Sequence, residues 1–294
     1  MTAGDLPGST GVGRVGLTVG ELEAAVAFYR DVVGLVVHTH DDGAATLGGP
    51  DGAFLELRVD PDSAQRPETA AGLFHTAVRV PSRGALADAL ARVREEWRLT
   101  GASDHLVSEA LYLRDPEGNG VEIYCDRPRA EWPLADDGRV QMVTDPLDLE
   151  ALATEATGAE TVPSGSDVGH VHLEVTSLEA AREWYADALG MNVRQEMDGA
   201  LFLAAGEYHH HVGCNVWNRR SAPTGGRGLD WFEVVVPADA LAATRDRFER
   251  AGFEPTTLDS RSVEPTDDSA GDDGGDFAVR DPDGIELRVR LDGS

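Results

Sequence analysis

Two histidines of this sequence recur at the same point of two similar segments and could bind a metal ion. His75 lies in FHTAVRV and His170 lies in GHVHLEV. Both segments alternate in the manner of a β-strand, in which successive side chains point to opposite faces. Val171 and Leu173 would lie on one apolar face, and His170 and His172 on the other. Because neutral imidazole is a good ligand for first-row transition metals, the recurrence favours ligation over two unrelated core histidines.

The elements that must position these histidines are themselves repeated. The segment GRVGLTVGELEAAVAFYRDVVGL, from Gly13, matches GHVHLEVTSLEAAREWYADALGM, from Gly169, at a single offset of 156 residues. Each predicts a strand, a turn, an amphipathic helix and a glycine stop. Weaker copies begin at Phe74 and Asp230 and end in the turn signatures D-P-E-G and D-P-D-G. We therefore expect four modules of one strand, one helix and three strands, at about 12–60, 71–128, 168–218 and 228–291.

The composition limits the classes of protein to be considered. The 294 residues suggest two domains, and 41% of them are hydrophobic, enough for sizeable cores. A net charge of −28 argues against a nucleic-acid partner, because phosphates would be repelled. No run of 18 apolar residues occurs and the first ten residues lack the features of a secretion signal, so we expect no membrane association. Two cysteines, Cys125 and Cys214, fit a reducing cytoplasm.

The four modules, their H-x-x-L-x-V openings and their D-P-x-G-x-x-x-E endings resemble the vicinal oxygen chelate superfamily. That superfamily includes glyoxalase I, extradiol ring-cleavage dioxygenases and bleomycin-binding proteins. The stretches SDHLVSEALYLRDPEGNGVEIYCDRP, GHVHLEV and GEYHHHVGCNVW are most similar to bacterial catechol-2,3-dioxygenase-like proteins of the CatE type. The resemblance implies an α+β fold, with four βαβββ modules paired into two curved, mixed-sheet half-barrels and the helices outside.

Domain boundaries follow from the positions of the modules. We expect a first vicinal-oxygen-chelate domain at 1–128 and a second at 166–294. Between them, at 129–165, we expect a linker that contains a short helix at 147–156. The acidic stretch 259–275 is rich in glycine and serine, and we expect it to be a solvated loop inside module four.

The resemblance also assigns metal-ligand positions, one on the first strand and one on the last strand of each module. In chain order the first-strand positions match Arg14, His75, His170 and Asp230, and the last-strand positions match Glu56, Glu122, His211 and Glu286. His211 is assigned because Asn215 follows it by four residues, as in the glyoxalase-type ending E-x-x-x-N. His209 has the same strand parity and stays an alternative.

Each cavity in this superfamily is built by two modules, so the pairing of modules decides the ligand set. Pairing two with three would combine His75, Glu122, His170 and His211. This set contains the two histidines and one carboxylate of non-haem Fe(II) enzymes. Pairing three with four would put Asp230 where a histidine is usual, and pairing one with two would put Arg14 in a ligand position. We favour two with three, although contiguous pairing within each half is the simpler topology.

The number of protein ligands separates the reactions that the resemblance allows. An extradiol dioxygenase uses three, because a chelating catechol and dioxygen need three open positions, whereas a glyoxalase-like isomerase or lyase uses four. We predict a dioxygenase for a catechol-like substrate, with one divalent ion, Fe(II) first and Mn, Ni or Zn as alternatives. A metal-free binding protein is a third reading, with a cavity lined by Trp217, Trp231 and Tyr124. A homo-oligomer is left open.

A dioxygenase also needs a base near the metal that removes a catechol proton. Three residues are candidates. His105 lies in SDHLVSEALY, His172 shares a strand face with His170, and Tyr208 directly precedes the run of three histidines.

The acidic excess generates a prediction about stability. The 53 acidic residues are scattered over the chain, and all 25 basic residues are arginine, a composition that we expect of a high-salt cytoplasm. The thermal midpoint should rise steeply between dilute buffer and about 1 M salt, where the Debye length falls to about 3 Å and repulsion between carboxylates is screened. A midpoint that stays flat over this range, measured by circular dichroism, would contradict the halophilic interpretation.

Overall fold

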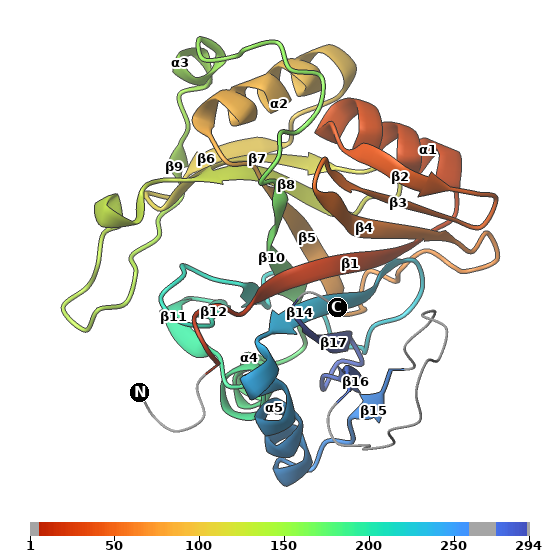
Figure 1. The fold of residues 1–294 in the computed structure, drawn as a ribbon, viewed down its shortest axis with the longest axis vertical. Helices are drawn as coiled ribbons and strands as arrows, with labels where there is room; N and C mark the ends of the chain where they lie inside the picture. Colours follow the sequence, from red (N-terminus) through yellow and green to blue (C-terminus); the bar gives the residue numbers. More distant parts are fainter. Residues whose placement is uncertain (1–5, 259–274, 293–294) are drawn as a thin grey trace.

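Two mixed β-sheets form the centre of the molecule, and the helices lie outside them (Figure 1). The computed structural model describes residues 6–258 and 275–292. The predicted α+β class and the repeat of strand, helix and strands are confirmed. The predicted loop 259–275 lies, except for its last residue, outside the described residues.

The first half of the chain contains modules one and two. Module one consists of β1 (Gly11–Val19), α1 (Leu22–Ala27), the π-helical turn η1 (Phe28–Val33), β2 (Val36–His40), β3 (Ala44–Gly49) and β4 (Gly52–Val59). Module two consists of β5 (Gly72–Arg79), α2 (Arg83–Glu96), β6 (Gly101–Asp104), β7 (Ser108–Arg114) and β8 (Gly120–Asp126). The predicted glycine stop of the first helix is present, because Gly34 has a left-handed φ of 88°.

The second half repeats this order after a linker. The linker holds the 3-10 turn η2 (Arg129–Glu131), β9 (Asp145–Pro146) and α3 (Leu149–Ala153), the last within the predicted helix 147–156. Module three consists of β10 (Asp167–Glu174), α4 (Leu178–Ala181), η3 (Arg182–Ala188), β11 (Asn192–Met197), β12 (Ala200–Ala204) and β13 (Val212–Asn215). Module four consists of β14 (Gly228–Val236), α5 (Ala238–Arg250), β15 (Thr256–Thr257), β16 (Phe277–Arg280) and β17 (Glu286–Leu291).

Each sheet combines one module from each half of the chain. One has the strand order β11-β12-β13-β10-β5-β8-β7-β6-β9 and joins modules two and three through the antiparallel pair β5–β10. The other has the order β15-β16-β17-β14-β1-β4-β3-β2 and joins modules one and four through β1–β14. The favoured pairing of modules two and three is therefore confirmed. The domain boundaries at 128 and 166 stay a prediction.

Contacts outside the sheets join the two modules of the same half. The helices of modules one and two lie together at one end of the molecule, and those of modules three and four at the other (Figure 1). In each half a buried tyrosine of the first helix donates a hydrogen bond to the aspartate of the second module's D-P-x-G turn. Tyr29 bonds Asp115 at 3.2 Å, and Tyr185 bonds Asp281 at 2.9 Å.

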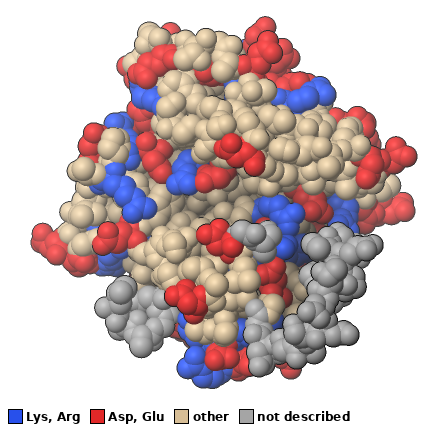
Figure 2. All heavy atoms as spheres, in the orientation of Figure 1, with Lys and Arg blue, Asp and Glu red and all other residues tan. Residues whose placement is uncertain are grey.

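On the face of the molecule drawn in Figure 2, the acidic residues are spread out rather than gathered in one patch. Figure 2 shows carboxylates around the rim of the visible face and several arginines among them. Many arginines pair with a neighbouring carboxylate, as Arg182 does with Glu196 at 2.6 Å. Among the described residues no helix is both long and apolar enough to cross a bilayer.

The repeated tyrosine–aspartate bond generates a prediction about stability. Burial raises the pKa of Asp281 to about 6, so its carboxylate depends on protein donors once it is ionised. At pH 8 we expect Tyr185→Phe to lower the free energy of unfolding by about 1–3 kcal/mol, measured by urea denaturation. In a double-mutant cycle with Asp281→Ala, which removes the acceptor, the two losses should not add. Additive losses would show that the hydrogen bond contributes nothing beyond packing.

Candidate metal centre

The junction of β10, β5 and β8 brings two histidines and a carboxylate onto one face of the sheet. His170 lies opposite Ala77 in the antiparallel pair, and Ala77 lies opposite Glu122 in the parallel pair β5–β8. Residues paired in this way point to the same face, and His75 shares that face because it lies two residues before Ala77. Since Ala77 has only a methyl group, the longer side chains of its neighbours on either side can meet above it.

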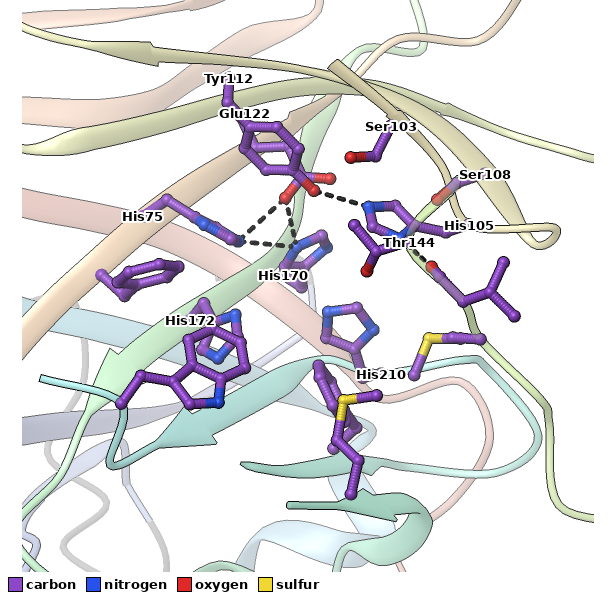
Figure 3. A pocket seen from close by; sticks show the side chains of 16 residues that line it. His75, Ser103, His105, Ser108, Tyr112, Glu122, Thr144, His170, His172 and His210 are labelled. Atoms are coloured by element: carbon purple, nitrogen blue, oxygen red, sulfur yellow. Dashed lines mark hydrogen bonds and ion pairs between the residues drawn. The ribbon is translucent and has the colours of Figure 1, made fainter. Parts of the chain in front are cut away.

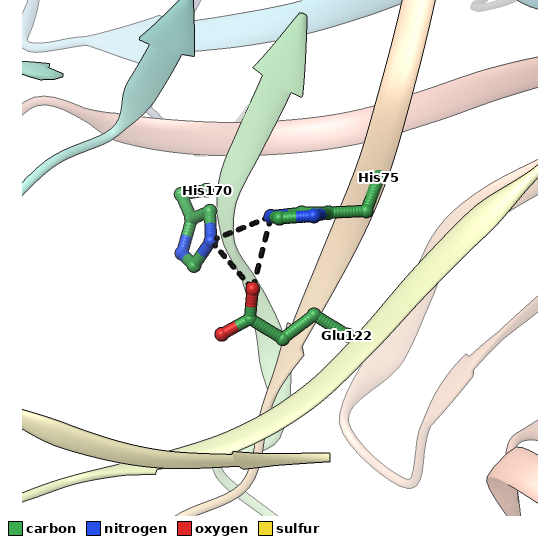
Figure 4. A group of neighbouring side chains, drawn as sticks. All are labelled: His75, Glu122 and His170. Atoms are coloured by element: carbon green, nitrogen blue, oxygen red, sulfur yellow. Dashed lines mark hydrogen bonds and ion pairs between the residues drawn. The ribbon is translucent and has the colours of Figure 1, made fainter. Parts of the chain in front are cut away.

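Three donor atoms converge on one point of this face (Figure 4). Oε2 of Glu122 lies 2.9 Å from Nε2 of His75 and 3.3 Å from Nε2 of His170, and the two Nε2 atoms are 3.3 Å apart. Ligands bound at right angles to one ion lie about 3 Å apart, because metal–nitrogen bonds are about 2.1 Å long. The donor spacing and the two-imidazole, one-carboxylate chemistry therefore fit a divalent transition metal.

The protonation states of these residues also suit a cation. Burial alone would raise the pKa of Glu122, but the charges and hydrogen bonds of His170 and His75 outweigh it and hold that pKa well below its usual range. Burial lowers the pKa of His170 to about 4, against the opposing effect of Glu122. Near neutral pH the site then offers a carboxylate and a neutral His170 imidazole, the forms that bind metals.

His211, the fourth residue of the predicted ligand set, does not join this group. It lies in the loop before β13 rather than inside a strand, and its Nδ1 accepts a hydrogen bond from the backbone N–H of Ala205. The reason is the register of β13. In module two, Glu122 pairs with Ala77, which lies two residues after His75. In module three, the corresponding residue two positions after His170 is His172, and it pairs with Gly213. The position in module three that corresponds to Glu122 is therefore Gly213, two residues after His211.

A cavity of about 290 Å³ opens above the three residues (Figure 3). One wall carries hydroxyl and histidine side chains, and the rest is apolar and aromatic. Its lining beyond the three consists of Phe74, Ser103, His105, Ser108, Tyr112, Met142, Val143, Thr144, His172, Met197, Phe202, His210 and Trp217. Residues 142–144 belong to the linker, so the linker supplies part of the wall.

The predicted bases occupy three different situations. His172 lines the cavity and is 3% exposed, and its buried Nε2 has no hydrogen-bond partner among the described residues. His105 also lines it, but both ring nitrogens are engaged, Nε2 with the Tyr112 hydroxyl at 2.7 Å and Nδ1 with the carbonyl oxygen of Val143 at 2.5 Å. Tyr208 lies behind the lining, with its hydroxyl bonded to Asp126 at 2.9 Å.

Two of the three aromatic residues expected of a binding cavity lie elsewhere. Trp217 lines the cavity, whereas Tyr124 is fully buried and bonded to Tyr208 at 2.8 Å. Trp231 belongs to the other sheet. Sequence reasoning missed His210 and Tyr112. Tyr112 in β7 lies directly opposite Glu122 in β8, and this pairing would have identified the tyrosine as a cavity residue. No local pattern distinguishes His210 from its two histidine neighbours.

The equivalent place in the other sheet holds no such group among the described residues. There Gly16 takes the position opposite Glu56, and the indole of Trp231 fills the space above it. Arg288 stacks on that indole, with 4.0 Å between the guanidinium carbon and the ring centre. Of the predicted positions in this sheet, Arg14 pairs with Glu233 at 3.0 Å, and Asp230 is exposed. Arg14 and Trp231 thus take the positions of His75 and His170, whereas Glu56 keeps the position of the carboxylate.

Comparisons with known proteins agree with this architecture. The family model described as Glyoxalase/Bleomycin resistance protein/Dioxygenase superfamily matches residues 11–123 and 167–289. Catechol-2,3-dioxygenase of Bacillus subtilis is 39% identical over 284 residues, which cover 93% of this chain and 94% of that protein. Biphenyl-2,3-diol 1,2-dioxygenase 2 of Rhodococcus globerulus is 26% identical over 42% of this chain and 61% of that protein. Glyoxalase I from Zea mays shares the fold, with a TM-score of 0.55 at 15% identity over 96% of this chain and 92% of that chain.

The geometry generates a prediction about the ligands. We expect His170→Ala to weaken the binding of added Zn(II) or Fe(II) by more than about 100-fold, since the loss of outer-shell partners alone costs 10–100-fold. His211→Ala should leave binding unchanged, because His211 stands outside the group. Stoichiometry and Kd can be measured by metal analysis and competition with a chelator.

The need for a small side chain at Ala77, beneath the three donors, can be tested separately. Ala77→Val should weaken metal binding by forcing His170 and Glu122 apart, whereas Ala45→Val, at an equally buried position of the other sheet, should not. Equal metal binding in wild type, Ala77→Val and His170→Ala would remove this group from consideration as a metal centre.

Proposed function

Because the chain belongs to the glyoxalase/bleomycin resistance protein/dioxygenase superfamily, we propose that it is a metal-dependent extradiol dioxygenase that opens the ring of a catechol. The observation that carries the proposal is the three-donor group His75, Glu122 and His170, from which His211 stands apart. A fourth protein ligand would favour the isomerase or lyase chemistry of glyoxalases. The 39% identical relative is named for the same reaction, which supports the proposal.

The donor set matches the cofactor that this chemistry needs. A divalent ion held by the three residues would supply Lewis acidity and open coordination positions for a chelating diol and dioxygen. Two imidazoles and one carboxylate with open positions are typical of non-haem Fe(II) oxygenases, so we propose Fe(II), with Mn, Ni and Zn as ions of similar ligand preference. Cytoplasmic location and adaptation to high salt stay predictions from the composition.

The cavity wall favours a neutral, apolar substrate. Phe74, Phe202 and Trp217 form an aromatic side, and Met142 and Met197 add flexible apolar surface. Within residues 6–258 and 275–292 no arginine lines the cavity, and the chain has no lysine. An anionic substituent on the ring would therefore lose its hydration without gaining a cationic partner. A catechol with an alkyl or aryl substituent fits this wall better than a carboxylated one.

Two further histidines of the lining could accept the hydroxyl proton of a catechol. His172 and His210 both face the cavity, and burial lowers the pKa of each well below its usual range, so both are neutral at pH 7. His105 is held by Tyr112 and Val143, and it orients the tyrosine hydroxyl at the cavity wall.

The proposed reaction can be tested directly. Protein reconstituted anaerobically with Fe(II) should consume oxygen with 4-methylcatechol and form a yellow ring-opened product. We expect kcat/KM for 4-methylcatechol to exceed that for 3,4-dihydroxybenzoate by at least about 10-fold. The ratio should fall in Phe202→Arg, which supplies a cation to the wall.

One outcome of the oxygen-uptake assay would contradict the proposed dioxygenase activity. No oxygen uptake with any neutral or anionic catechol, in protein shown to hold one Fe(II) per chain, would exclude the dioxygenase. The protein would then be tested for glyoxalase-like isomerase or lyase activity on hydroxyl-bearing substrates.

A further inference from the structure

A row of three polar side chains leads from the cavity wall into the protein. His210 lines the cavity, and its Nδ1 lies 2.7 Å from Nδ1 of His209. The other ring nitrogen of His209, Nε2, lies 2.9 Å from Oδ1 of Asp126. His209 is fully buried, between the rings of Tyr208 and Trp132. Such a row, inside the protein, fixes which nitrogen carries each proton.

Asp126 is the acceptor at the far end of the row, with 23% of its side chain exposed. It lies on β8 four residues after Glu122 and therefore on the same face. Its carboxylate also accepts from the Tyr208 hydroxyl at 2.9 Å and pairs with Arg79 at 3.3 Å. Burial alone would raise the pKa of Asp126, but the hydrogen bond from His209, the charge of Arg79 and the hydrogen bond from Tyr208 hold that pKa below its usual value. An ionised carboxylate can only accept hydrogen bonds.

The protons of the two histidines follow from this acceptor. Since Asp126 accepts, Nε2 of His209 must carry a proton. Arg79 shares its positive charge between Asp126, at 3.3 Å, and Asp167, at 2.6 Å. His209 is fully buried, and an imidazolium there would lose its hydration, so we take His209 as the neutral imidazole with a bare Nδ1. Nδ1 of His210 must then be the donor in the bond between the two rings. His210 is left with a bare Nε2, the ring nitrogen available to a molecule in the cavity.

We propose that Asp126 and His209 are positioning residues that hold His210 in its Nδ1–H tautomer and so present an unprotonated Nε2 to the cavity. The ring of His210 lies against that of the ligand His170, with 4.0 Å between their centres (Figure 3). A hydroxyl of a molecule held at the metal centre would then meet an acceptor rather than a second donor. Only this catalytic consequence rests on the proposed function, because the tautomer is a property of the protein alone.

The tautomers can be read by nitrogen NMR of full-length protein labelled with ¹⁵N-histidine, with and without Zn(II), using His210→Gln and His209→Gln to assign the signals. We expect His210 to show a protonated Nδ1 and a bare Nε2, and His209 the reverse. In Asp126→Asn the amide oxygen should stay toward Arg79 and the NH₂ group should face His209. Both histidines should then exchange tautomer, and His210 should show a protonated Nε2.

Asp167→Asn is the matched control. Asp167 also pairs with Arg79, at 2.6 Å, and among the interactions of the described residues it makes no hydrogen bond or ion pair with His209, so this variant should keep the wild-type tautomers. If the protein is a dioxygenase, Asp126→Asn should also lower kcat for oxygen uptake by about 100-fold, with a smaller change in KM.

Two results would overturn the proposal. One is a protonated Nε2 on His210 in wild-type protein, which needs no variant to fold. The other is an unchanged His210 tautomer in folded Asp126→Asn. Loss of oxygen uptake in all forms with the expected tautomers intact would count against the proposed function and not against the positioning role.

Discussion

The site depends on the antiparallel pairing of β5 with β10, two strands that lie about a hundred residues apart in the chain. Their register sets His170 opposite Ala77 and His172 opposite His75, and β8 then adds Glu122 beside Ala77. A shift by one residue would turn every one of these side chains to the other face. The buried apolar face of the same strands holds the register, because slipping it would expose that face to water.

Burial of charge is the cost of this arrangement, and hydrogen bonds offset it. Glu122 is buried, and Asp126 lies on the same face of β8 with 23% of its side chain exposed. Each carboxylate is held ionised by histidines, His75 and His170 at one and His209 at the other, with Arg79 adding a charge to the second. The first group faces the cavity and suits a cation. The second is closed by Tyr208 and Trp132 and acts on the cavity only through His210.

The two sheets show how one repeat can carry chemistry in one place and only structure in another. Both are built from two modules and both place a small residue on the first strand, Ala77 in one and Gly16 in the other. Above Ala77 the neighbours are metal-type donors, whereas above Gly16 lies Trp231 with its stacked arginine. Fold and activity are therefore separate properties of this molecule, and side chains at a few matched positions decide the second.

Sequence alone determined the fold class, the four modules and the recurrence of His75 and His170, because strand alternation and turn signatures are local patterns. It also favoured the pairing of modules two and three, because the other pairings would put Arg14 or Asp230 in a metal-ligand position. Tertiary structure decided the rest. The place of His211 depended on the register of β13, and the role of His210 depended on Asp126, 84 residues earlier in the chain. Neither follows from local pattern, since a register or a contact between distant strands is set by packing across the whole sheet.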